Sequence, residues 1–199
     1  SASPAQINTS ASGNELPLQR TGFLSLRAWI SRLAINTEQV VFVLILLAAV
    51  GTRFFDLEAR VMSHDESLHT YYSWQLSEGR EYKHDPMMHG PFQFHIVALS
   101  YFLLGDSDFS ARVPAVLFGI ASVAFLWAFR RYIGKLGVLA AALLMVISPY
   151  MLFYARYARN DIIVVFFMAL MFYAVWRYLE KGNKQTLFLL TAALVFQFT

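Results

Sequence analysis

Four apolar stretches, each about as long as the core of a bilayer, constrain the fold of this chain most strongly; they cover residues 40–57, 113–129, 136–154 and 162–179. A bilayer core offers no water, so a backbone that crosses it must satisfy its own hydrogen bonds. Runs of roughly 20 apolar residues do this as α-helices. We therefore predict an all-α fold of polytopic transmembrane helices.

The composition agrees with lipid as the main solvent of the chain. Hydrophobic residues make up 57% of the 199 residues and charged residues only 15%, which is too apolar for an ordinary water-soluble domain. The net charge is only +3, and the basic residues lie between the apolar runs instead of forming one patch. We therefore expect a lipid bilayer as a partner and no nucleic acid.

The two ends of the chain differ in character. Residues 1–22 are rich in Ser, Ala, Asn and Gln, which predicts a disordered tail. Residues 23–37 place apolar side chains at helical spacing with arginines among them, which predicts an interfacial helix on the cytoplasmic side. Residues 38–199 form the expected membrane domain. Its last apolar run, 187–199, is too short to span, so we expect an incomplete fifth helix and a longer natural chain.

Basic residues indicate the orientation, because Lys and Arg favour the cytoplasmic side of a membrane. Three clusters flank the apolar runs: Arg27 and Arg32; Arg130, Arg131 and Lys135; Arg177, Lys181 and Lys184. They share one side only when the short apolar segment 92–104 does not span. We therefore predict a multi-pass plasma-membrane protein with a cytoplasmic N-terminus. Its long first extracytoplasmic loop, 58–112, would contain juxtamembrane amphipathic helices.

The predicted outer loop collects the titratable side chains. All five histidines and most of the acidic residues lie in it. The chain has no cysteine, so a metal ion there would depend on histidine and carboxylate ligands. A loop of this length far exceeds what a simple connection needs, and we expect the functional residues in it.

The first element of the loop begins with a capping box of Ser63 and Glu66 and continues as a helix to about Glu78. We expect an apolar stripe on its packed face and polar residues opposite; the stripe is Leu68, Tyr72 and Leu76, and the polar set is Glu66, Thr70, Ser73 and Ser77. Asp65 and His69 fall on the stripe, where a carboxylate is costly without a task or a partner. Asp65 is thus a catalytic candidate, as is Glu66. The alternatives are a cap role for Glu66, a helix-dipole role for Asp65, and a His69–Asp65 pair.

A second element, residues 84–91, has the composition of a metal site. His84, Asp85 and His89 could together hold a divalent metal ion, because imidazole and carboxylate groups suit such ions. The alternative is a Pro/Gly turn whose histidines bond backbone carbonyls.

A third element follows the third predicted span. Arg156 and Arg159 lie on the outer side, against the positive-inside tendency, and phosphate binding at the membrane surface would explain them. Asp161 follows at the start of the fourth span. The alternative is that Asp161 caps that span and pairs with Arg159.

The order of these elements over residues 40–199 resembles a known family. An acidic pair, Asp65 and Glu66, leads an amphipathic helix soon after the first span; a Pro-containing turn and a short apolar helix follow, and residues 109–114 open the next span. This order is similar to that of C-type membrane glycosyltransferases of the protein mannosyltransferase and aminoarabinose transferase kind (glycosyltransferase family 39-like). The turn at 89–91 is most similar to the prokaryotic flippase-associated subgroup.

The resemblance implies transfer of a sugar from a polyprenyl-phosphate carrier to an unknown acceptor hydroxyl on the extracytoplasmic face. Asp65 matches the family's first-loop acid, the catalytic base, and Asp161 matches its second acidic position. Arg156 and Arg159 become candidates for binding the phosphate of the lipid-linked donor. Such a reaction needs a carboxylate to accept the hydroxyl proton and cations to stabilise the departing phosphate.

Two other functions fit the sequence less well. A non-catalytic transmembrane subunit derived from such a fold would explain the incomplete last helix, because other membrane subunits would cover it. A transporter or flippase component would be expected to carry ionisable residues within its spans, and here they lie near the span ends.

Overall fold

The computed structural model describes residues 36–80, 82–83 and 90–198, and in these ranges the regular elements are helices and no strand occurs. The predicted all-α class is confirmed. The predicted tail over 1–22 and nearly all of the predicted interfacial helix over 23–37 lie outside the described residues. The elements are α2 (Thr37–Phe54), α3 (His64–Ser77), α4 (Pro91–Leu104), α5 (Asp108–Phe125), η2 (Leu126–Phe129), α6 (Arg130–Ile147), α7 (Pro149–Tyr154), α8 (Asp161–Lys181) and α9 (Lys184–Phe198).

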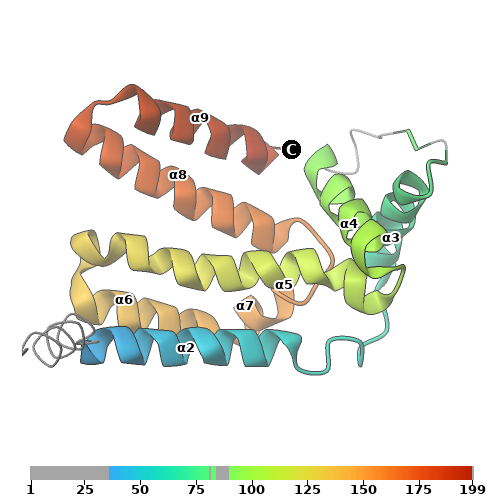
Figure 1. Ribbon diagram of the computed structural model, residues 1–199, viewed down its shortest axis with the longest axis horizontal. Helices are drawn as coiled ribbons and strands as arrows, with labels where there is room; N and C mark the ends of the chain where they lie inside the picture. The colour runs from blue at the N-terminus through green and yellow to red at the C-terminus, as the bar shows by residue number, and fades with distance from the viewer. Residues whose placement is uncertain (1–35, 81, 84–89, 199) are drawn as a thin grey trace, which may run out of the picture. The chain divides into compact units, whose positions relative to one another are not determined.

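Three stretches of the described chain are long and apolar enough to cross a membrane: Thr37–Phe54, Asp108–Ile147 and Asp161–Lys181. The middle stretch of 40 residues turns back on itself, so that α5 and α6 run in opposite directions (Figure 1). Helix α2 packs against both α5 and α6, and α8 packs against α5.

The reversal between α5 and α6 depends on a short 3-10 helix and one glycine. Helix η2 follows α5 directly, and Gly134 within α6 has φ 74° and ψ 177°. A side chain at this positive φ would be strained, and glycine permits the break at little steric cost.

Helices α8 and α9 form a second antiparallel pair (Figure 1), joined at Gly182 with a left-handed φ of 58°. The ring of Phe196 in α9 lies 5.1 Å from that of Phe92 in α4 and 5.2 Å from that of Phe167 in α8, centroid to centroid. The last apolar run therefore packs against the other helices through aromatic contacts.

Helices α3 and α4 lie at the end of the bundle where α2 ends and α5 begins (Figure 1). Val97 and Tyr101 of α4 form a small core with Ala111 of α5. Burial raises the pKa of Tyr101 to about 12, so its hydroxyl stays protonated. The short apolar segment of the predicted loop thus packs on the start of α5.

A buried arginine fixes the end of α6 against α2. Arg53 is 1% exposed, and its Nη2 donates to the carbonyl of Met145 at 3.1 Å. In a continuing helix this carbonyl would accept from the N–H of residue 149, which is a proline and has none. Arg53 therefore supplies the missing donor where α7 begins, and a cation is favourable at this C-terminal end of α6.

Basic and acidic side chains pair at the opposite end of the helices. Arg130 Nη2 donates to Glu38 Oε2 at 2.8 Å, and Arg131 Nη2 donates to Glu180 Oε1 at 3.0 Å. These pairs join the start of α2 and the end of α8 to the turn between α5 and α6. The basic cluster at residues 130–135 and the one at residues 177–184 thus lie at the same end of the bundle (Figure 1).

Candidate active site

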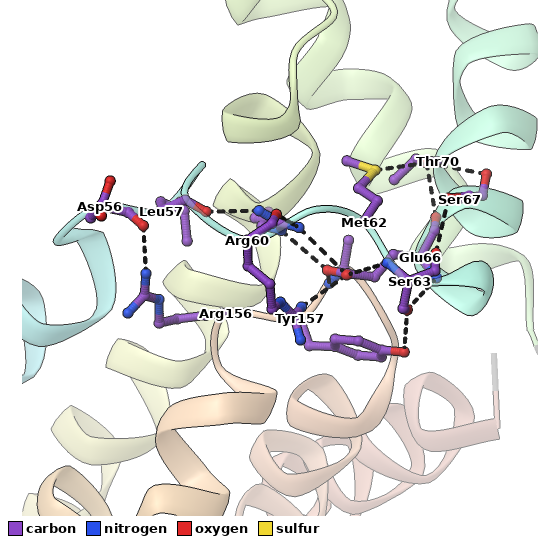
Figure 2. A network of polar contacts seen from close by, with 12 residues as sticks. Asp56, Leu57, Arg60, Met62, Ser63, Glu66, Ser67, Thr70, Arg156 and Tyr157 are labelled. Carbon is purple, nitrogen blue, oxygen red and sulfur yellow. Dashed lines mark hydrogen bonds and ion pairs between the residues drawn. The ribbon is translucent and has the colours of Figure 1, made fainter.

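Glu66 lies at the centre of a buried polar network that joins α3 to α5 and to the loop after α7 (Figure 2). Its side chain is fully buried, and its Oε1 accepts hydrogen bonds from Arg112 Nε at 3.1 Å and the Ala158 N–H at 3.0 Å. Oε2 accepts from Arg60 Nη2 at 2.8 Å and the Ser63 N–H at 3.1 Å. These donors fill the lone-pair sites of a carboxylate. The predicted capping box is confirmed, and the wider network favours a structural role for Glu66 over proton transfer.

Arg112 is the main cationic partner of Glu66. It comes from the second turn of α5 and is 1% exposed, and it also donates to the carbonyls of Leu57 and Arg60, each at 2.8 Å. A buried guanidinium is stable only when it is paired and hydrogen-bonded in this way. Sequence reasoning assigned it no role, although an arginine at the start of an apolar span signals a buried partner.

The loop of residues 155–160, between α7 and α8, is held from both sides. Gln93 Nε2 of α4 donates to the carbonyl of Ala158 at 3.0 Å, while Glu66 accepts from the N–H of the same residue. The hydroxyls of Tyr157 and Ser63 are hydrogen-bonded at 2.7 Å. The next residue, Arg159, is therefore presented beside the start of α3.

Arg159 joins the two aspartates that were predicted to be catalytic. Its Nη1 lies 2.8 Å from Asp65 Oδ2, and its Nε lies 3.4 Å from Asp161 Oδ2. The side chain of Asp65 is 49% exposed and that of Asp161 38%, so both carboxylates remain accessible. The alternative pairing of Asp161 with Arg159 is confirmed. Capping by Asp161 is wrong, because Asn160 occupies the N-cap position.

Helix α7 lies between two cavities. One face of α7 lines a cavity of about 310 Å³ through Pro149, Leu152 and Phe153. Arg156, which follows the helix, lines the same cavity. The other face contributes Tyr150, Met151 and Tyr154 to a cavity of about 300 Å³, which Arg159 and Asp161 also line. The two arginines predicted to bind one phosphate therefore line different cavities.

Comparison with known proteins identifies the family. The model of the dolichyl-phosphate-mannose-protein mannosyltransferase family matches residues 88–198, more than half of the chain. The chain belongs to this family. It is a family of membrane glycosyltransferases, and the apolar helices agree with a membrane protein. No curated protein and no solved structure matches the chain significantly.

The part of the chain that the mannosyltransferase family model matches contains Arg156, Arg159 and Asp161, whereas Asp65 and Glu66 precede it. The association of Asp65 with the matched region therefore comes from the structure, through its ion pair with Arg159.

The expected orientation of α3 is wrong. The buried face is polar and consists of Glu66, His69, Thr70 and Ser73, whereas Leu68, Tyr72 and Leu76 are partly exposed. The reason is that Arg112 and the 155–160 loop offer charged and hydrogen-bonding partners on that side, so a polar face can be buried without loss. Asp65 accordingly lies at the edge of the packed face.

His69 bonds the backbone carbonyl of Asp65, whereas the alternative from the sequence was a pair with the carboxylate of Asp65. Its Nδ1 donates to the carbonyl of Asp65 at 2.7 Å, and its ring stacks on Phe94 at 5.4 Å between centroids. The carboxylate of Asp65 is thus left to Arg159.

The predicted metal ligands, His84, Asp85 and His89, lie outside the described residues. Among the residues that the structure does describe, no group of three or more His, Cys, Asp or Glu side chains could hold a metal ion.

Proposed function

We propose that this protein is a membrane glycosyltransferase that moves a sugar from a polyprenyl-phosphate carrier to an acceptor hydroxyl on the extracytoplasmic face. Membership of the mannosyltransferase family supports the reaction class. The observation that carries the residue assignment is the cluster in which Arg159 lies between the carboxylates of Asp65 and Asp161.

In the proposed reaction, Asp65 is the general base. Its half-exposed carboxylate accepts the proton of the acceptor hydroxyl while the hydroxyl oxygen forms a bond to the anomeric carbon of the sugar. The bond between that carbon and the carrier phosphate breaks, and its electron pair leaves with the phosphate. Arg156 of the 155–160 loop provides positive charge for the leaving group. Asp161 holds Arg159 from the other side.

We further propose that the end of the bundle bearing α3 and α4 faces the extracytoplasmic side of the plasma membrane, with the N-terminus in the cytoplasm. The internal basic clusters at the opposite end support this orientation, because Lys and Arg favour the cytoplasmic side. A divalent metal bound by His84, Asp85 and His89 remains part of the proposal and would neutralise phosphate charge.

Replacement of Asp65 tests the function. In membranes that contain the full-length protein, Asp65→Asn is expected to lower transfer from dolichyl-phosphate mannose by about 100-fold or more, because general-base catalysis typically contributes this much. Exposed Glu78 at the end of α3 provides the control: Glu78→Gln should leave transfer unchanged. Undiminished transfer by Asp65→Asn would contradict the proposed role of Asp65, whereas absence of transfer by the wild type would favour a non-catalytic membrane subunit.

A further inference from the structure

The cavity of about 310 Å³ beside α7 differs chemically from the cavity that Asp161 lines. Arginine side chains and apolar side chains line it together: Arg60, Arg112 and Arg156 with Leu57, Leu152 and Phe153. No acidic residue lines it among the residues that the structure describes. Its lining therefore suits an anionic group attached to an apolar chain.

Positive charge is in excess around this cavity. Arg53, Arg60, Arg112 and Arg156 lie at this end of the bundle, and within the described ranges their ion-pair partner is one carboxylate, that of Glu66. Arg112 and Glu66 are both buried and neutralise each other. The three arginines that line the cavity thus share one carboxylate, which leaves about two positive charges in excess among the described residues.

The guanidinium groups of Arg60 and Arg156 retain hydrogen-bonding capacity. Arg60 is 40% exposed, bonds Glu66 through Nη2, and lies over the ring of Phe153 at 4.7 Å. Arg156 uses Nη2 to donate to the carbonyl of Asp56 at 2.7 Å (Figure 2). A guanidinium carries five N–H donors and matches the oxygens of a phosphate group. Each arginine thus has donors left for a ligand.

Arg159 lacks this excess charge. Two carboxylates lie within ion-pair distance of it, so the Asp65–Arg159–Asp161 cluster carries a net charge of about −1 when both aspartates are ionised. Such a cluster repels a phosphate. Arg159 is better suited to hold Asp65 in place than to bind a leaving group.

We propose that the cavity beside α7 binds the phosphate of a membrane lipid through Arg60 and Arg156, apart from the Asp65 cluster. The apolar lining accommodates the first carbons of the lipid chain. Several lining residues follow soon after the ends of α2 and α6, which places the cavity near the proposed membrane surface. That this lipid is the sugar carrier rests on the proposed function, whereas the phosphate site itself does not.

Binding measurements on the purified full-length protein in detergent test this site, with microscale thermophoresis as the readout. Farnesyl phosphate is the probe, and farnesol, phosphatidylglycerol and inorganic phosphate are compared with it. Arg156→Gln should weaken binding of farnesyl phosphate by about tenfold or more, because a charge-assisted hydrogen bond is lost. Arg156→Lys should retain part of the affinity. Arg80→Gln is the matched control, since Arg80 lies over Trp74 and does not line the cavity.

Three results would overturn the proposal: equal binding of farnesol, equal binding of inorganic phosphate, or unchanged affinity in Arg156→Gln. Tight binding of phosphatidylglycerol as well would support a lipid-phosphate site that does not select the carrier. A melting curve checks the fold of Arg156→Gln, whose described side-chain hydrogen bond is exposed. Asp65→Asn should bind farnesyl phosphate normally while losing transfer. If the wild type binds the probe through Arg156 yet transfers no sugar, the proposed function fails and the phosphate site stands.

Discussion

At the scale of single residues, Asp65 and Glu66 are neighbours with opposite surroundings. Glu66 is fully buried and saturated with donors, whereas Asp65 is half-exposed and bonded on one oxygen. The first turn of α3 places one carboxylate inward and the next at the edge. Glu66 therefore holds the 155–160 loop in place, whereas Asp65 lies at the exposed side of the same loop.

Replacing Glu66 should damage stability more than replacing Asp65. Glu66→Gln leaves the buried guanidinium of Arg112 without its counter-charge, and breaking a buried pair in this way costs about 3–5 kcal/mol. Asp65→Asn removes a partly exposed pair and should cost about 1 kcal/mol or less. Thermal unfolding of the two purified variants in detergent measures the difference. Equal melting temperatures would contradict the assigned roles.

At the scale of elements, α5 and the loop after α7 approach each other closely at one glycine. A Cβ atom built on Gly119 would lie 2.6 Å from the Cβ of Ala155 and 3.3 Å from Arg53 Nε. The contact sets where the loop that carries Arg156 and Arg159 begins. Small residues on both sides are what this approach requires.

Gly119→Ala should therefore shift the loop and lower both stability and transfer. Overpacking of this kind costs about 1–3 kcal/mol. Gly51→Ala in α2 is the matched control, because a Cβ there meets nothing within 4 Å, and it should be neutral or slightly stabilising. Melting temperature and transfer activity of both variants are to be compared. A Gly119→Ala protein as stable and active as Gly51→Ala would show that the loop tolerates displacement.

The start of α3 could be predicted from the sequence, but its buried face could not. The capping box is a local signal, and Ser63 and Glu66 satisfy it within one turn. The partners that bury the polar face are distant: Arg112 follows Glu66 by 46 positions and Ala158 by 92. Local periodicity contains no information about such partners, so the apolar stripe indicated the wrong face of α3 as the buried one. The same limit concealed the separation of Arg156 from Arg159.

At the scale of the whole described bundle, charged groups lie mainly at the helix ends. One end carries the Glu38–Arg130 and Arg131–Glu180 pairs, and the other carries the Asp65 cluster and the Glu66 network (Figure 1). Apolar runs typical of membrane spans were readable from the sequence, because each depends on residues that follow one another. The reversal at Gly134 was also near the predicted boundary between the second and third spans.

The proposed orientation predicts a clear labelling pattern. The chain has no cysteine, so a single one can be introduced at each end. Glu58→Cys should react with a membrane-impermeant maleimide in intact cells, whereas Lys135→Cys, at a position 63% exposed, should react only after permeabilisation. Both variants should insert in the membrane normally. The reverse pattern would place the Asp65 cluster in the cytoplasm and exclude extracytoplasmic transfer.

The six residues of α7 have a consequence for both cavities. Both cavities share this one short wall, which is only about a turn and a half of helix. Arg53 bonds the end of α6 just before this helix, and Glu66 accepts from the N–H of Ala158 just after it. A ligand in one cavity and a ligand in the other would therefore contact opposite faces of the same short helix.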